Sequence, residues 1–114
     1  MTDAEHLLNT LRSQGRACSA FGSPMYGELL DRMVSDIQAG GVFAAIFAGH
    51  EDDPRRLAVP LRLLGGLHRL VLDGRAAALR RWYPSTGGSW NADAAWPQIT
   101  LAAANYLDPL RAAL

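Results

Sequence analysis

The sequence contains no lysine and only one cysteine, Cys18, among its 114 residues. A single cysteine excludes a disulfide within the chain, which fits a reducing compartment, and we expect a cytoplasmic protein. The eleven positive charges are all arginines and are matched by eleven acidic residues, so the formal charge is zero. The sequence therefore lacks the basic excess of a non-specific nucleic-acid binder, and we expect no nucleic-acid partner.

Long apolar runs are also absent. No segment approaches the roughly 20 apolar residues that span a bilayer, and the first residues, "MTDAEHLLNTLRSQ", lack the pattern of a signal peptide. We therefore expect no membrane segment. Hydrophobic residues nevertheless make up 49% of the chain, which favours a folded domain over disorder, and the length suits one domain, residues 1–114.

The spacing of the apolar residues predicts helices throughout. Thr2 and Glu5 have capping-box spacing, so we expect a helix to begin near Asp3. Further helices are predicted at 24–39 with Ser23 as the cap, at 42–47, at 61–72, before Pro84, and from Asn91 or Asp93 onward, with a bend or restart after Asp108 at Pro109. The prediction is an all-α, compact bundle of about five to six helices around a central apolar helix.

The segment Leu61–Leu72 is apolar on nearly every side, which is typical of a helix at the centre of a fold. Only Arg62 and Arg69, seven positions apart, share a narrow polar ribbon. If both are buried they need counter-charges, because an unpaired buried charge is very costly. Glu51, Asp52, Asp53 and Asp73 are the candidate acids, and a phosphate or carboxylate of a ligand is the alternative.

The most polar stretch is "GHEDDPRR", which begins at Gly49. Adjacent side chains are poorly arranged as metal ligands, so we expect no metal site here. The favoured interpretation is a loop in which Asp52 or Asp53 caps the next helix and Pro54 lies in its first turn.

His68 lies within the apolar arc of the predicted central helix, where a hydrogen bond to a carbonyl or hydroxyl group would explain it. The competing hypothesis is a small-molecule or metal-binding enzyme whose polar side chains converge on one pocket. The ligand-binding candidates for that pocket are His50, Asp52, Asp53, Arg62, His68 and Arg69. No arrangement of serine, histidine and acid nominates a catalytic residue.

Aromatic residues gather around the glycine-rich "STGGSW" segment. Such a cluster marks a partner or ligand surface, or it closes the rim of the core. The candidates for an interaction surface are Trp82, Tyr83, Trp90 and Trp96.

Four stretches occur in an order that resembles a known bacterial family: "GSPMYGELLDRM", "AGHEDDP", "LRLLGGLHRLVLDGR" and "YPSTGG". The resemblance covers about Phe21 to Trp96 and points to the domain of unknown function 2332. It implies an N-terminal helical module of a longer protein, whose later part is similar to an S-adenosylmethionine-dependent methyltransferase. The glycine loop expected for that cofactor is missing here, so no cofactor is expected in this chain.

The resemblance favours a non-catalytic module that packs on a methyltransferase-like domain or another protein partner. Self-association as a homodimer is the weaker alternative.

Overall fold

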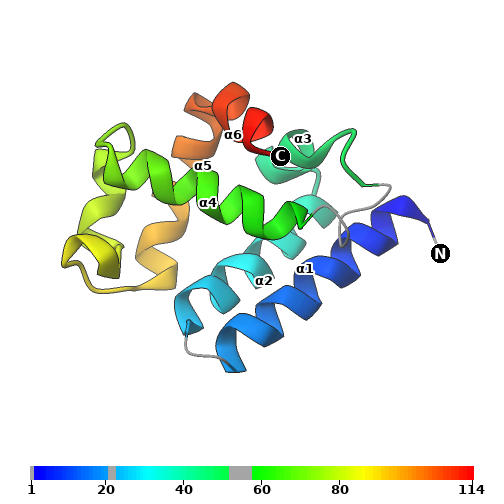
Figure 1. Cartoon of the computed structure of the whole chain (residues 1–114), viewed down its shortest axis with the longest axis horizontal. Helices are drawn as coiled ribbons and strands as arrows, with labels where there is room; N and C mark the ends of the chain where they lie inside the picture. The colour runs from blue at the N-terminus through cyan, green and yellow to red at the C-terminus, as the bar shows by residue number, and fades with distance from the viewer. Residues whose placement is uncertain (1, 21–22, 52–57) are drawn as a thin grey trace.

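The computed structural model describes residues 2–20, 23–51 and 58–114, and these form helices without any strand. The all-α prediction is confirmed. The α-helices are α1 (Asp3–Ala20), α2 (Pro24–Gln38), α3 (Val42–Phe47), α4 (Val59–Leu72), α5 (Ala92–Asn105) and α6 (Leu107–Ala113), with 3-10 helices η1 (Ala77–Trp82) and η2 (Pro84–Thr86) between α4 and α5. Figure 1 shows α1 and α2 side by side below α4, with α6 and α3 above it.

Helix α1 begins as predicted, because the Glu5 amide donates to Thr2 Oγ1 at 3.2 Å and the Thr2 amide donates to Glu5 Oε2 at 2.7 Å. It crosses α2 closely at two glycines. A Cβ atom on Gly27 would lie 3.0 Å from the Gly15 carbonyl oxygen and 2.0 Å from Ser19 Oγ. Only a residue without a side chain fits there, which explains how two helices of ordinary composition approach so closely.

The buried apolar residues form one continuous cluster drawn from all six α-helices and from η1. Phe43 and Phe47 of α3 are its largest fully buried side chains. Phe43 stacks against Trp96 of α5, with ring centroids 5.6 Å apart. Helix α3 has only six residues, so tertiary contacts rather than helix propensity stabilise it.

Helix α4, which the sequence predicted to be the central helix, contacts α1, η1 and α6. It is not buried on every side, however. Leu61 and Leu72 are 49% and 48% exposed, and Arg62 and Arg69 are exposed as well. The expectation that this helix runs through the centre of the fold is therefore wrong for one arc, which faces solvent and carries both arginines.

The second half of the chain differs from the prediction in detail. The segment before Pro84 is a 3-10 helix, and Ser23 makes no side-chain capping bond. Asn91 does cap α5, since its side chain accepts from the Ala94 amide at 3.1 Å. The last helix breaks at Tyr106, so Pro109 lies in the first turn of α6, where its missing N–H costs little.

Arg111 holds α6 against the end of α3. One guanidinium nitrogen, Nη1, donates to the carbonyl oxygens of Ala45, Ile46 and Ala48 at 2.7, 3.1 and 3.0 Å. These carbonyls belong to the C-terminal part of α3, where helical partners run out and the helix dipole favours a positive charge. The contact therefore fixes the position of α6 relative to the rest of the bundle.

Candidate functional site

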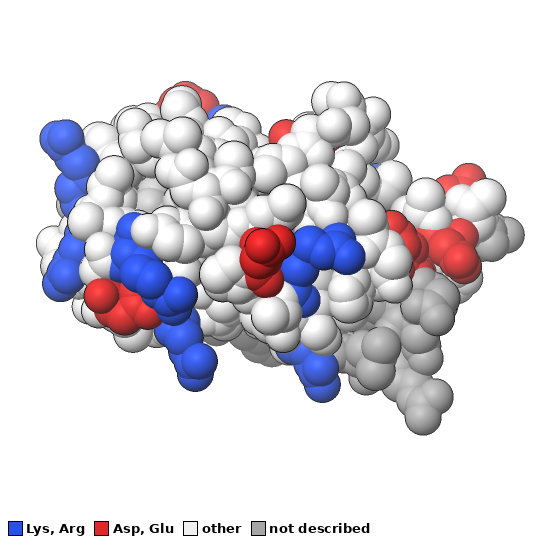
Figure 2. Space-filling model, turned by 90° about the horizontal axis from the view of Figure 1, so that it is seen from above, with Lys and Arg blue, Asp and Glu red and all other residues white. Residues whose placement is uncertain are grey.

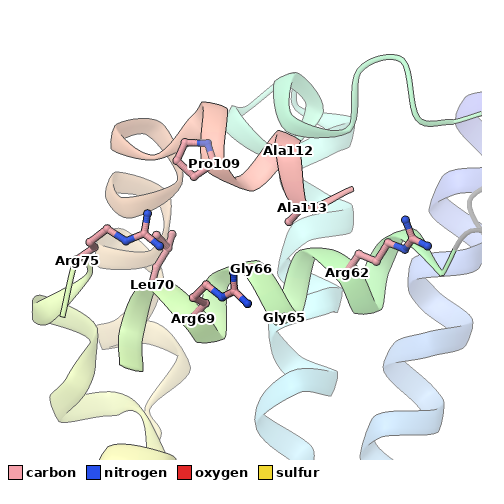
Figure 3. Close-up of a pocket in the computed structure, with 9 residues that line it drawn as sticks. All are labelled: Arg62, Gly65, Gly66, Arg69, Leu70, Arg75, Pro109, Ala112 and Ala113. Atoms are coloured by element: carbon pink, nitrogen blue, oxygen red, sulfur yellow. The ribbon is translucent and has the colours of Figure 1, made fainter. Parts of the chain in front are cut away.

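A groove of about 560 Å³ runs between α4 and α6. Figure 3 shows three arginine side chains around it: Arg62 and Arg69 extend from α4, and Arg75 from the segment that follows. The other lining residues are small or apolar: Gly65, Gly66, Leu70, Pro109, Ala112 and Ala113. The groove thus has a small-residue floor and a basic rim.

The three arginines differ in how they are paired. Arg75 is committed to Asp73, because its Nη2 and Nε lie 2.7 and 2.9 Å from Asp73 Oδ2. Arg62 Nη1 donates to the main-chain oxygen of Leu114 at 3.0 Å, so this guanidinium group already has one hydrogen-bond partner at the end of α6. Within the part of the chain that the structure describes, no Asp or Glu side chain pairs with Arg62 or Arg69.

The acids predicted to neutralise Arg62 and Arg69 are engaged elsewhere or lie outside the described residues. Asp73 hydrogen-bonds the Arg75 side chain, which together with the nearby positive charges lowers the pKa of its carboxyl group. Asp73 also raises the pKa of Arg75. The Glu51 carboxylate accepts from the Gly49 amide at 2.9 Å. Because Arg62 and Arg69 are exposed, water hydrates them and the fold requires no counter-charge.

Positive charge is unevenly spread over the surface. Arg69, Arg75, Arg80 and Arg81 follow one another from the last turn of α4 to η1. Figure 2 shows most of the visible arginines gathered towards the left end of the face seen from above. Although the formal net charge is zero, one end of this face presents a local basic patch.

The arc of α4 beside the groove carries five exposed residues, Leu61, Arg62, Gly65, Arg69 and Leu72, which we call the α4 outer face. At 100° per residue, both leucines and Gly65 fall on one line, and both arginines lie on the side towards α6. The outer face is therefore amphipathic, with an apolar line beside a basic line.

The two glycines of α4 give a test of this geometry. A Cβ atom on Gly65 would meet nothing within 4 Å, whereas one on Gly66 would lie 3.0 Å from Ala113 Cβ and 3.3 Å from Leu110 Cδ2. We expect Gly65→Ala to stabilise the fold by roughly 0.5–1 kcal/mol, the usual gain for alanine over glycine inside a helix. Gly66→Ala should show no such gain because α6 is crowded against it. Urea unfolding of both variants measures the difference, and a gain at Gly66 would mean that α6 lies farther from α4.

His68 lies in a different cluster, on the other border of the exposed arc. Its Nδ1 is hydrogen-bonded to the Tyr83 hydroxyl, which also contacts the Tyr26 hydroxyl. Tyr26 Oη lies 3.4 Å from the same imidazole nitrogen. With the proton on His68 Nε2, Tyr83 donates to the imidazole and Tyr26 donates to Tyr83. Hydroxyl groups thus satisfy the half-buried histidine, as the sequence suggested, and His68 does not line the groove.

Tyr83 is 4% exposed, and burial is the main reason that its pKa is raised, with the hydrogen bond to Tyr26 adding to the effect. The unfolded chain therefore loses this proton near pH 10 while the folded chain keeps it. We expect the associated stability to be fully present below about pH 10 and to fall as the pH rises further. Tyr83→Phe removes this contribution, so its unfolding free energy should fall less steeply between pH 9 and 11. Urea titrations at several pH values give the unfolding free energy of both proteins. If it falls equally steeply with pH in both, the Tyr83 hydroxyl is not buried as described.

The remaining ligand-binding candidates do not join the groove. The His50 amide donates to the Phe47 carbonyl at 2.9 Å, and His50 is not among the lining residues. Asp52 and Asp53, with the predicted cap and Pro54, lie outside the described residues, and α4 begins with Ala58 as its N-cap. Of the six candidates, the structure brings together Arg62 and Arg69. Among the described side chains, no group of three or more His, Cys, Asp or Glu residues is arranged to hold a metal ion.

The four aromatic candidates are largely used within the domain. Tyr83 is buried, and Trp96 stacks on Phe43. Trp90 donates from Nε1 to Glu28 Oε2 at 2.7 Å. Trp82 packs against the core, and the Arg81 guanidinium lies 4.7 Å from its ring centroid. Each tryptophan is only partly exposed, so these residues close the rim of the core.

Sequence reasoning missed the α6 wall of the groove and the role of Tyr26. Ala112 and Ala113 gave no signal because alanine is common on any helix. The Tyr26 hydroxyl reaches Tyr83 across 57 positions of sequence, a contact that only the fold reveals. Arg75 had a usable signal, since it follows Asp73 by two positions across a glycine turn.

Fold and groove together define the class of protein: an all-α domain with an arginine-rimmed, small-residue groove on one side. The chain belongs to the family of uncharacterized proteins conserved in bacteria, DUF2332, whose family model matches residues 8–114. That description names no activity, so the methyltransferase-like character of the family stays a prediction. Comparisons with curated proteins and with solved structures gave no match. None of the described helices is long and apolar enough to cross a membrane.

Proposed function

We propose that this chain is a non-catalytic helical module that docks on another protein domain through the α4 outer face. The observation that carries the proposal is the exposure of Leu61 and Leu72, at 49% and 48%, on a helix whose other apolar side chains are buried. Two half-exposed leucines on one helical line, with open space at Gly65 between them, offer a ready contact for a second helix.

The favoured partner is the methyltransferase-like part that the family resemblance implies. Any S-adenosylmethionine would then be bound by that part rather than by this chain. The role of this chain is to supply a preformed helical surface, and its own side chains take no part in the chemistry.

The test is to measure, by calorimetry, the affinity of this chain for the methyltransferase-like part of a longer family member. Leu61→Ser with Leu72→Ser should weaken the complex at least about tenfold, because two partly buried leucines are lost from the interface. Leu101→Ser is the matched control, since Leu101 is 55% exposed on α5, away from the outer face. No measurable complex, or an equal loss with Leu101→Ser, would refute the proposal.

Self-association is the alternative use of the same face. A homodimer would bury the leucine line of one protomer against that of its partner. Light scattering over a concentration series separates the two: a mass that doubles with concentration, and stays monomeric for Leu61→Ser with Leu72→Ser, assigns the face to a second copy.

The groove favours a second candidate function, binding of a small anion. Its volume of about 560 Å³ falls in the range of small-molecule sites, roughly 300–1,000 Å³. A thermal-shift screen with phosphates, divalent metals and S-adenosylmethionine tests this candidate. A phosphate-dependent rise in melting temperature that disappears in Arg69→Gln would support it.

A further inference from the structure

The proposed docking function leaves open what kind of surface the α4 outer face recognises. The positive charge of this face favours a partner surface that carries negative charge. No Asp or Glu side chain among the described residues pairs with Arg62 or Arg69, although Arg62 donates to the main-chain oxygen of Leu114. Arg75 adds a third guanidinium group at the groove, and Asp73 pairs with it. An apolar partner surface would leave Arg62 and Arg69 desolvated and unpaired, which is costly.

The spacing of Arg62 and Arg69 adds a geometric constraint. They are seven positions apart on one helix, which places their Cα atoms about 10 Å apart along its axis. On a second helix that runs alongside α4 in either direction, carboxylates at positions i and i+7 are separated by the same distance as Arg62 and Arg69. A helix laid along α4 can therefore pair with both arginines at once, whereas one small anion cannot readily bridge that distance.

The floor of the groove suits the close approach of a helix backbone. Gly65, Ala112 and Ala113 contribute at most a methyl group each, and space is open beyond Gly65. Leu61 and Leu72, eleven positions apart, lie near the two ends of the same arc, where apolar side chains of a partner helix can cover them.

We propose that the partner of the α4 outer face is an acidic amphipathic helix, whose carboxylates two turns apart pair with Arg62 and Arg69 while its apolar line covers Leu61 and Leu72. This inference rests on the proposed docking function and specifies the chemistry of the partner. Arginine suits the role because its planar guanidinium binds a carboxylate through two parallel hydrogen bonds. Positive charge on one face also accelerates the approach of an acidic partner at low salt.

Stapled helical peptides of about four turns provide a direct probe, since short free helices are marginal in water. One peptide carries an apolar line and glutamates at i and i+7, and its control carries glutamines there. Fluorescence anisotropy should show that the glutamate peptide binds about tenfold more tightly at low salt, and that the difference shrinks at high salt.

Variants of the chain assign the preference to particular residues. Arg62→Gln with Arg69→Gln should remove the preference for glutamate, and Arg80→Gln with Arg81→Gln, a pair of exposed arginines away from the groove, should leave it intact. Circular dichroism checks that both double variants are folded.

Each other outcome overturns the inference. If the two peptides bind equally tightly, the α4 outer face recognises only apolar side chains and the acidic partner is ruled out. The proposed docking function would be unaffected by that result. If neither peptide binds but pyrophosphate binds in an Arg69-dependent way, the groove is a small-anion site. If neither peptide binds and the methyltransferase-like part binds through Leu61 and Leu72, the partner is not an acidic helix. Failure of that last complex is the separate result that removes the docking function itself.

Discussion

Phe43→Ala should cost about 3–5 kcal/mol, the usual range for truncating a buried phenylalanine. Phe43 is 1% exposed and stacks on Trp96, so the substitution removes apolar burial, leaves a cavity and breaks the aromatic contact between α3 and α5. A domain of this size has a total stability of roughly 5–15 kcal/mol, so the variant is expected to be close to unfolding at room temperature. Urea titration followed by circular dichroism measures the loss.

Leu101→Ala is the control for that measurement. It also truncates an apolar side chain to alanine, but Leu101 is 55% exposed, so the unfolding free energy should change by less than about 0.5 kcal/mol. A Phe43→Ala protein as stable as the control would show that α3 does not pack into the core as described.

Arg111→Met should cost about 2–3 kcal/mol, because it removes hydrogen bonds from a charged donor to the carbonyls of Ala45, Ile46 and Ala48. Methionine keeps much of the aliphatic length, so the loss reports on the guanidinium group. Amide hydrogen exchange should become faster in α6 than in the original protein, and it should change much less in α1 and α2, because Arg111 links α6 to α3.

The control here is Arg16→Met on α1, an exposed arginine. It removes one positive charge without disturbing α6 and should leave both stability and exchange near the values of the original protein. Equal effects of the two substitutions would attribute the loss at Arg111 to net charge rather than to the contacts with α3.

Local signals in the sequence predicted most of the helices. The Thr2–Glu5 capping box, the Asn91 cap and the apolar spacing of α2 depend on residues within a few positions of one another, and all of them act as predicted. The helix break was predicted after Asp108 but occurs at Tyr106. The Tyr106 hydroxyl donates to the Arg75 carbonyl, a contact between distant positions that a local pattern does not predict.

The burial of α4 was the main error. An apolar sequence shows that a helix has many possible contacts but not how many neighbours the fold provides for them. Leu61 and Leu72 look the same in sequence as Leu63 and Leu70, yet only the second pair is buried. Arg62 and Arg69 are exposed because they lie on the same solvent-facing arc.

The candidate site could be predicted only in part. Arg62 and Arg69 were found from their seven-residue spacing on one helix, a local property. The groove also needs α6, which begins 38 positions after Arg69 and contacts α3 through Arg111. No local pattern predicts such a contact, because it depends on how three helices are arranged.

Arg62 and Arg69 are exposed to solvent in this chain, and the proposed docking function requires a partner to cover them. Modification of arginines with phenylglyoxal, followed by mass spectrometry, measures the accessibility of both side chains in the chain alone and after mixing with the proposed methyltransferase-like partner. We predict that Arg62 and Arg69 react readily in the free chain and are protected in the complex, while Arg80 and Arg81 react in both. If Arg62 and Arg69 are unreactive in the free chain, the α4 outer face is not exposed as described. If their reactivity is unchanged in the complex, the partner does not dock on this face.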